Sequence, residues 1–316
     1  MKINYRKFIE ENFMVLDRDT QIPTPFKLNK AQSKYVDMIS KEYPEQEGVR
    51  DIILKARQQG FSSLILALFT VDFICRDYSI SICISHRKDG TELLFKKVKF
   101  YIESYLMKLV RTQGEASGWD EMTIQKKFDE TKKNYLKTDS KNMIENSTNN
   151  AMFYIGTAGT KVGGRGGSAR NIHFSEAAFY NDTELITAQE IIVGTAQQVP
   201  QGKGMIFIES TANGEGNYYY DEWQRANEFD KDNKRKSAYK PIFFGWQEFY
   251  TEAWVNEKRK EFPNDKMWKQ EYPGDPDEAF ITSGTPYFDV VLLDTMLKKE
   301  IRPISYGKLA ADGNFI

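Results

Sequence analysis

The sequence has little cysteine and no long uncharged apolar segment. Two cysteines in 316 residues are too few for a disulfide framework, and the spacing of Cys75 and Cys83 does not fit a metal site. Both lie in apolar surroundings, so we expect small core residues. The longest apolar stretch, Leu64 to Ile74, is interrupted by Asp72 and is too short to span a bilayer. With a charged N-terminus that cannot be a signal peptide, the chain should be soluble and fits a reducing cytoplasm.

The sequence also lacks an excess of charge of either sign. Its formal net charge is -1, so any contact with nucleic acid must be local or shared with other domains. The composition, 40% hydrophobic and 28% charged residues, is ordinary for a globular protein and excludes the disordered and collagen-like classes. A chain of this length can bury a large core and can form two domains.

What is present is organised around residues 49–63, where an apolar strand is followed by a short polar turn and an apolar helix. This order matches the Walker A phosphate loop, G-x-x-x-x-G-K-S/T, whose backbone N–H groups cradle phosphates. Gly60 occupies the second glycine position, and Ser62 supplies the hydroxyl that reaches Mg²⁺. The segment therefore predicts a nucleotide-binding loop.

Two positions of this loop depart from the Walker A pattern. Lys55 stands at the first glycine position, and Phe61 stands at the lysine position. Lys55 and Arg57 are the positive charges of the loop, so we expect them to replace the missing cation. If the loop belongs to a nucleotide hydrolase, Lys55→Ala should then abolish hydrolysis of the nucleotide, and Phe61→Ala should spare most of that activity. On this motif alone, a strand–turn–helix junction with incidental charges is the alternative.

An upstream polar segment can contribute to the same site. Asn29 can cap a helix whose apolar face includes Val36 and Ile39, and Gln32 lies in its first turn. The Gln32 amide offers a donor and an acceptor, which match the two edge groups of adenine. A solvated glutamine is the alternative.

Further strands and helices follow the predicted loop. Residues 78–84 and 152–157 predict strands, and an amphipathic helix is expected over residues 92–109. The polar residues 111–150 are expected to form an irregular surface excursion. One basic cluster on the helix is expected to be a solvated face. It consists of Lys96, Lys97 and Lys99.

A glycine-rich segment, residues 159–170, precedes the next strand. Its glycines suggest a mobile loop or a close approach to a ligand, with Arg165 near the centre, and a flexible linker is the alternative. The strand that follows ends in Ser175-Glu176, where a Walker B motif carries an Asp that supports Mg²⁺ and a Glu that polarises water. Ser175 occupies the aspartate position. His173 is expected to be a packed or edge side chain without a chemical role.

Residues 205–214 form a last apolar strand that ends in Ser210-Thr211 and a turn. Strands that alternate with helices imply a mainly parallel sheet, and ligands bind such sheets at the carboxyl ends of the strands. Lys55, Glu176 and Ser210 would all lie at that edge. Their common placement favours a functional site over a set of unrelated weak motifs.

Together, these segments resemble the large terminase subunit of tailed bacteriophages, specifically its N-terminal packaging ATPase. The resemblance covers roughly residues 25–290. It rests on residues 28–32, 55–63, 172–179, 210–214, 243–246, 270–273 and 278–284. Residues 28–32 look like the adenine-reading segment, and residues 55–63 look like a deviant Walker A. Residues 172–179 look like Walker B, and residues 210–214 look like the coupling motif. The last three ranges look like the segment that leads out of the ATPase.

The resemblance implies an α/β fold of the ASCE-type P-loop NTPases, with a mainly parallel sheet flanked by helices and a small lid-like subdomain. Residues 1–239 would form the ATPase core, and residues 240–316 a lid and linker that lead toward a C-terminal nuclease domain. The sequence stops at Ile316 without the clustered acidic residues of that nuclease, so an isolated ATPase region is expected.

The resemblance also implies catalytic roles. Glu176 would activate water, Arg57 would neutralise phosphate charge, and Arg165 would act as an arginine finger in trans, on a neighbouring subunit. Ser62 would hold Mg²⁺, with Ser175 or Glu176 acting through water.

Other residues would bind the nucleotide or respond to it. Ser210 and Thr211 would sense the γ-phosphate and couple hydrolysis to movement. The nucleotide-binding residues would be Gln32, Lys55, Ala56, Arg57, Gln58, Gln59, Gly60, Phe61, Ser62 and Ser63.

The implied function is an ATP- and Mg-dependent motor that drives double-stranded DNA into a procapsid, in the cytoplasm of an infected bacterial host. Its partners would be the portal protein, the small terminase subunit, the nuclease domain and further copies of the chain in a ring on the procapsid. A nucleic-acid helicase is one alternative, although no arginine-rich helicase motif follows residue 215. A nucleotide-binding scaffold with little hydrolysis is the other, suggested by Phe61 and Ser175.

Overall fold

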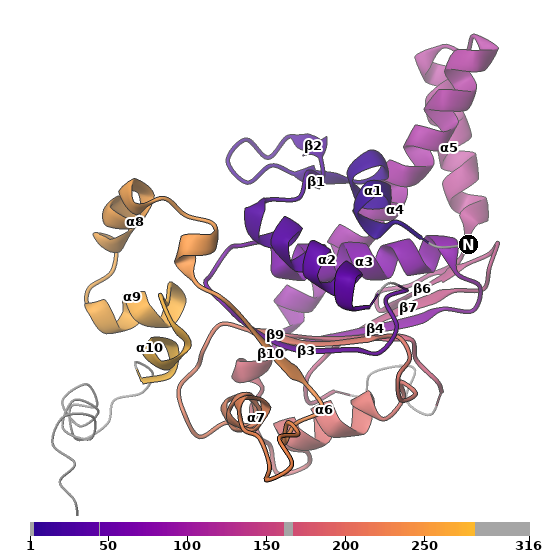
Figure 1. Ribbon diagram of the computed structural model, residues 1–316. Coiled ribbons are helices and arrows are strands. Elements are labelled where there is room, and N and C mark those ends of the chain that lie inside the picture. The colour runs from indigo at the N-terminus through magenta and orange to yellow at the C-terminus, as the bar shows by residue number, and fades with distance from the viewer. Residues whose placement is uncertain (1–2, 44, 161–166, 282–316) are drawn as a thin grey trace, which may run out of the picture.

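The computed structural model describes residues 3–43, 45–160 and 167–281. A mainly parallel sheet lies in the middle of this part of the chain, with helices on both faces (Figure 1). The predicted α/β fold class is therefore confirmed. A two-stranded hairpin, β1 (Met14–Leu16) with β2 (Pro23–Pro25), stands apart from the sheet. None of the described helices is both long and apolar enough to cross a bilayer.

Within the described residues, eight strands form the sheet in the order β10-β3-β9-β8-β4-β7-β6-β5. Neighbours from β10 to β7 are parallel, and β6 and β5 are antiparallel. β9 lies between β3, which leads into the predicted phosphate loop, and β8, which carries the predicted Walker B segment, as in an ASCE-type P-loop fold. The strands are β3 Val49–Lys55, β4 Ile80–Ser85, β5 Leu136–Asp139, β6 Met143–Asn146, β7 Met152–Thr157, β8 Asn171–Ser175, β9 Met205–Ser210 and β10 Lys240–Phe244.

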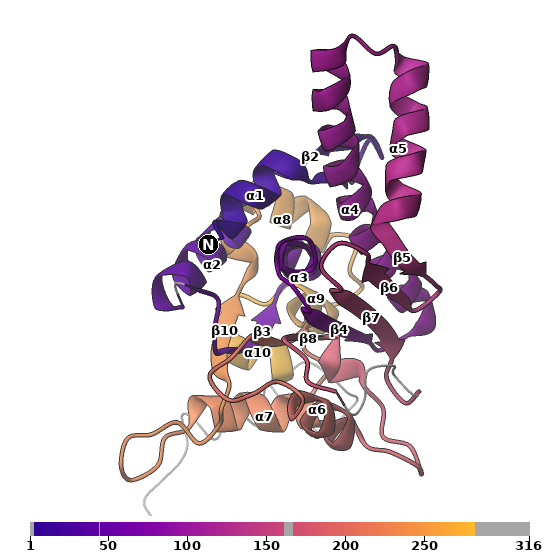
Figure 2. The same cartoon turned by 90° about the vertical axis from the view of Figure 1, so that its right-hand side faces the viewer.

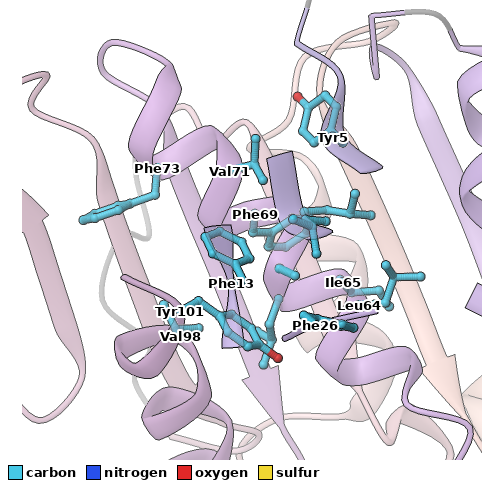
Figure 3. Packing of buried hydrophobic residues seen from close by; sticks show 14 of the residues in the cluster. Tyr5, Phe13, Phe26, Leu64, Ile65, Phe69, Val71, Phe73, Val98 and Tyr101 are labelled. Carbon is cyan, nitrogen blue, oxygen red and sulfur yellow. The ribbon is translucent and has the colours of Figure 1, made fainter. Parts of the chain in front are cut away.

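One face of the sheet carries a central helix, α3, that is apolar all round and buried on every side, as such a sequence requires. Figure 3 shows how aromatic rings enclose it: Phe13 stacks on Tyr101 with ring centroids 5.2 Å apart. The one charged residue of α3, Asp72, is also buried and accepts hydrogen bonds from Tyr5 and Arg170. The helices on this face are α1 Tyr5–Asn12, α2 Lys30–Glu42, α3 Phe61–Cys75, α4 Lys88–Ser117 and α5 Glu121–Tyr135.

The opposite face is covered by α6 (Ala188–Ala196) and α7 (Tyr218–Asn227). Successive side chains of a strand point to opposite faces, so Ile52 packs toward these helices and Ile53 packs toward α3. A third, smaller group of helices lies beside the sheet. It consists of α8 Glu252–Arg259, α9 Asp265–Glu271 and α10 Pro276–Ile281.

Residues 111–150 are not irregular, contrary to the prediction. α4 continues to Ser117 and ends at Gly118, whose φ of 68° lies in the left-handed region that favours glycine. Asp120 then caps α5 by accepting a hydrogen bond from the N–H of Thr123. The two helices form a pair that projects from the sheet (Figure 2), and β5 and β6 extend the sheet itself. Gly118 therefore marks a helix end, and the segment is regular where an irregular surface excursion was expected.

The structure refines two further expectations. Residues 240–244 form β10, which pairs in parallel with β3, so the predicted division after residue 239 falls at a strand of the main sheet. Cys83 is buried in β4, as expected, but Cys75 is exposed at the end of α3, so only one of the two cysteines is a core residue.

Candidate active site

Three parallel strands end at one edge of the sheet and bring predicted site residues together there. Lys55 ends β3, Glu176 follows β8, and Ser210 ends β9. The Lys55 Nζ lies 3.4 Å from a carboxylate oxygen of Glu176, and the Ser210 Oγ lies 3.5 Å from the other. These three side chains therefore lie where the parallel arrangement predicts.

Lys55 is buried between two carboxylates. Besides Glu176, its Nζ contacts Glu209 at 3.0 Å, and only 4% of the residue is exposed. Burial alone would lower the pKa of Lys55, but the two carboxylates raise it above its ordinary value. The lysine is therefore a fixed positive charge at the end of β3.

Glu209, which the sequence presents only as one residue of an apolar strand, lies at the centre of the site. It is fully buried, and its carboxylate accepts hydrogen bonds from Ser62 Oγ, at 3.1 Å to each oxygen, and lies 3.0 Å from His173 Nε2. Burial opposes ionisation, but Lys55 and His173 offset this and lower the pKa of Glu209. The signal in the sequence was a single acidic residue at the end of an otherwise apolar strand.

Glu176 has a strained backbone. Its φ of 56° and ψ of 46° lie in the left-handed region, which is unusual for a residue with a side chain. Such strain persists only where the surroundings enforce it, and it is frequent at active sites. The turn is held from β9, because the backbone N–H of Ala178 donates to Ser210 Oγ at 3.2 Å. The strained turn aims a partly exposed carboxylate at Lys55.

Several side chains of the phosphate loop support its shape. Phe61 is buried, with its ring centroid 4.6 Å from that of Phe244 in β10. Gln59 is buried and donates to the carbonyl of Gly245 at 2.7 Å, and Ala56 packs in a small cluster with α8 and α9. Any contribution of these three residues to phosphate binding therefore comes from the backbone.

The loop turns at two left-handed positions, Gln58 (φ 64°) and Gly60 (φ 77°). A Cβ at Gly60 would lie 2.7 Å from the Gln32 Nε2, so any other residue would strain the backbone and displace the Gln32 amide. Gln32 donates to the Gly60 carbonyl at 2.8 Å and accepts from the N–H of Asn29 at 3.1 Å. The amide N–H₂ thus holds the loop and the amide oxygen completes the cap of α2, so reading of adenine would require these bonds to be exchanged.

Arg57 points away from this cluster. Its side chain is 58% exposed and pairs with Glu271 of α9 at 2.8 Å, while its N–H donates to the Glu271 carbonyl. The Tyr250 hydroxyl donates to the Arg57 carbonyl at 2.9 Å. The structure therefore links this predicted catalytic arginine to the small helical group and does not bring it to Lys55.

A cavity of about 720 Å³ opens beside the first turn of α3. Ser62, Ser63, Ser175 and Glu176 line its inner end. Lys97 of α4 also lines it and donates to Ser63 Oγ at 2.8 Å, while much of its side chain stays exposed. Lys97 is exposed, as expected for a solvated face, and it also brings a second positive charge to the loop.

The remaining predicted residues lie around this centre. The Ser175 Oγ lies 3.4 Å from the Glu209 carboxylate, and Thr211 is buried next to Ser210. Arg165 lies outside the described residues.

The side chains present fit a magnesium nucleotide. The described residues contain no group of three His, Cys, Asp or Glu side chains that could hold a metal ion by itself. Mg²⁺ with a nucleotide needs few protein ligands, because phosphates and water supply most of its oxygens. The Ser62 hydroxyl, with the Glu176 and Glu209 carboxylates nearby, supplies oxygen groups of this kind. Lys55, Lys97 and the N-terminal end of α3 provide the complementary positive charge for phosphates.

Comparison with known proteins locates the fold among phage terminases. No family model and no curated protein matches the sequence. The large terminase of bacteriophage HK97 matches with a TM-score of 0.53 at 14% identity, over 85% of this chain and 53% of that chain. A mutant of the large terminase ATPase domain of Thermus phage P74-26 matches with a TM-score of 0.50 at 14% identity, over 82% of this chain and 95% of that chain.

A third structure, the large terminase of a thermophilic bacteriophage in complex with ADP, matches with a TM-score of 0.50 at 9% identity, over 80% of this chain and 54% of that chain. At these identities the likeness concerns the fold. The chain thus has the P-loop NTPase fold of phage large terminase ATPase domains, as the resemblance in its sequence predicts.

Proposed function

We propose that the chain is an ATP hydrolase, the motor of a viral DNA-packaging terminase. The observation that carries this proposal is the cluster of Lys55, Ser62 and Glu176 at the carboxyl edge of the sheet, on a fold shared with terminase ATPase domains. The strained backbone of Glu176 supports a catalytic role for its carboxylate.

Phosphoryl transfer needs positioning and charge neutralisation more than covalent help from the protein. In the proposed mechanism, the backbone of the phosphate loop and the N-terminal end of α3 hold the phosphates, and Lys55 neutralises their charge. Glu176 orients the attacking water and accepts its proton. Ser62 would hold Mg²⁺, which would supply further positive charge for the phosphates.

The signal for movement would leave the site through β9. Ser210 contacts both Glu176 and the turn that follows it, and the Gln270 side chain donates to the carbonyl of Ala212, two residues farther along, at 3.4 Å. A change at the γ-phosphate can therefore reach α9 through a short series of contacts. We infer that Ser210 and Thr211 couple hydrolysis to movement in this way.

The partners belong to the same proposal. The chain would act on double-stranded DNA in the cytoplasm of an infected bacterium, as a ring of copies on the procapsid, with the portal protein, the small terminase subunit and a C-terminal nuclease domain. Arg165 would complete the active site of the neighbouring copy. The net charge of -1 agrees with DNA contacts that are shared within such an assembly.

A steady-state phosphate-release assay with and without assembled partners tests the proposal. Glu176→Gln keeps the size of the side chain, so nucleotide binding should persist while turnover falls by ~10²-fold or more. Turnover of Glu176→Gln at the parental rate would refute the assignment. Absence of hydrolysis by the parent, even in a verified assembly, would favour the scaffold alternative, and strand separation of duplex DNA would favour the helicase.

The same assay tests action in trans. A chain with Arg165→Ala keeps its own Glu176, and a chain with Glu176→Gln keeps its own Arg165. In a mixed ring, each can supply what its neighbour lacks, so partial recovery of turnover is expected. No recovery in a verified mixed ring would leave Arg165 as a residue that acts within its own subunit or as a simple loop charge.

A further inference from the structure

The carboxylate that the Walker B segment lacks is present on the neighbouring strand. Ser175 of β8 stands at the aspartate position, and it pairs in register with Glu209 of β9. Side chains at paired positions of parallel strands point to the same face of the sheet. Glu209 therefore points to the face on which α3 begins, where an aspartate at position 175 would also point.

The contacts of Glu209 match this placement. Both of its oxygens lie 3.1 Å from the Ser62 hydroxyl, and its carboxylate lies 3.4 Å from the Ser175 hydroxyl. Lys55 and His173 contact it at 3.0 Å each. A buried carboxylate is tolerated only where it is paired and hydrogen-bonded, and these side chains from β3, α3 and β8 satisfy it.

We propose that Glu209 has taken over the metal-supporting role of the Walker B aspartate. It is fully buried, so it acts as a positioning residue: by accepting a hydrogen bond from the Ser62 hydroxyl, it leaves the lone pairs of that oxygen free for Mg²⁺. This inference rests on the proposed function, because it concerns the magnesium nucleotide of the same site. Groups that orient a metal ligand in this way commonly change metal affinity by about 10–100-fold when they are replaced.

The exchange also explains why position 175 carries serine. An aspartate there would lie in register with Glu209 and place two carboxylates side by side in a buried pocket with one lysine. Like charges at such a distance disfavour ionisation of both groups. The two positions are therefore coupled, and the site needs one carboxylate, which either strand can supply.

A competing account makes Glu209 only the counter-ion of Lys55. The two accounts differ in what Mg²⁺ does. If Glu209 only holds Lys55, its replacement weakens nucleotide binding equally with and without the metal. If it positions Ser62, its replacement removes the gain in affinity that Mg²⁺ confers and largely spares the metal-free affinity.

Binding of a fluorescent ADP analogue, titrated in EDTA and in excess Mg²⁺, separates these accounts without any measurement of turnover. Mg²⁺ should tighten binding by the parent. Glu209→Gln should reduce that gain about tenfold or more, with the affinity in EDTA within about threefold of the parental value. The double variant Ser175→Asp with Glu209→Gln returns a carboxylate from β8 and should recover most of the gain. Glu130→Gln, which removes an exposed carboxylate on α5, is the control and should keep the gain.

Thermal unfolding and circular dichroism first establish that each variant is folded. If Glu209→Gln alone does not fold, the Mg²⁺ gain of the double variant is compared with that of Ser175→Asp alone, and this comparison becomes the test. An unchanged gain in folded Glu209→Gln, an equal loss in both buffers, or no recovery in the double variant overturns the inference. If the parent binds no nucleotide in either buffer, the proposed function itself fails, and this outcome is distinct from a loss confined to the variants.

Discussion

At the level of single residues, the charge balance of the site depends on Lys55. Lys55→Ala removes the cation expected at the phosphates and leaves the buried Glu209 without its ion-pair partner, which should cost about 3–5 kcal/mol of stability. We therefore expect loss of hydrolysis together with a lower melting temperature. Thermal unfolding, ADP binding and phosphate release measure the two effects separately. Lys126→Ala, an exposed lysine on α5, is the control and should match the parent; a Lys55→Ala chain that melts and hydrolyses like the parent would contradict both roles.

Asp51 gives the protein a pH-dependent stability that is separate from the active site. It is buried in β3 and accepts a hydrogen bond from the Tyr35 hydroxyl at 2.6 Å. Burial raises the pKa of Asp51 to about 6, whereas an aspartate in the unfolded chain titrates near ~3.9. The folded chain therefore holds a proton that the unfolded chain releases between about pH 4 and pH 6, and the free energy of unfolding falls as the pH rises through this range.

Asp51→Asn removes this titration. Relative to the parent, the variant should gain on the order of 2–3 kcal/mol between pH 4 and pH 7, whatever its absolute stability. Urea unfolding at a series of pH values gives the difference. Asp129→Asn on the exposed face of α5 should show no such trend, and a pH-independent difference for Asp51→Asn would refute the assignment.

At the level of elements, the position of Phe61 changes the test that the sequence suggested. The ring is a core group between α3 and β10, so Phe61→Ala should cost about 3–5 kcal/mol and cannot report on catalysis alone. Phe61→Leu keeps most of the volume and should cost less than about 1.5 kcal/mol, with turnover close to that of the parent. Melting temperature and phosphate release check this. Loss of turnover in a stable Phe61→Leu chain would show that the ring does more than pack.

The elements that the sequence predicted are those with a local signal. Asn29 caps α2 as expected, because the bonds between Asn29 and Gln32 span three residues. The junction of β3 and α3 and the end of β8 are likewise predicted by residues that lie close together in the sequence. The role of Glu209 is different, since Ser62 lies 147 residues away in the sequence and only the pairing of β8 with β9 brings the partners together. β10 was missed as a sheet strand for the same reason, because its pairing with β3 is distant in sequence.

At the level of the whole molecule, the small helical group contacts two parts of the site, the phosphate loop and the chain that follows β9. Arg57 connects the phosphate loop to α9 through Glu271. Gln59 connects the loop to the carbonyl of Gly245, in the segment between β10 and α8. Gln270 of α9 reaches the chain that follows β9. In the proposed function, a change at the phosphate loop on nucleotide binding or release can therefore shift these helices. The helices can in turn stabilise one conformation of the phosphate loop.

The Arg57–Glu271 pair provides a test of this connection. If Arg57 leaves Glu271 to neutralise the γ-phosphate, Glu271→Gln removes a competitor for the arginine and should favour ATP over ADP. An exposed ion pair contributes at most about 1 kcal/mol, so the ratio of ATP to ADP affinity should rise by no more than about fivefold. Arg57→Ala should lower the same ratio and abolish the effect of Glu271→Gln in the double variant. Competition binding with a non-hydrolysable ATP analogue and with ADP measures the ratio. An Arg57→Ala chain with the parental ratio would mean that Arg57 only fastens the loop to α9, and Glu271→Gln would then lower stability slightly without changing nucleotide preference.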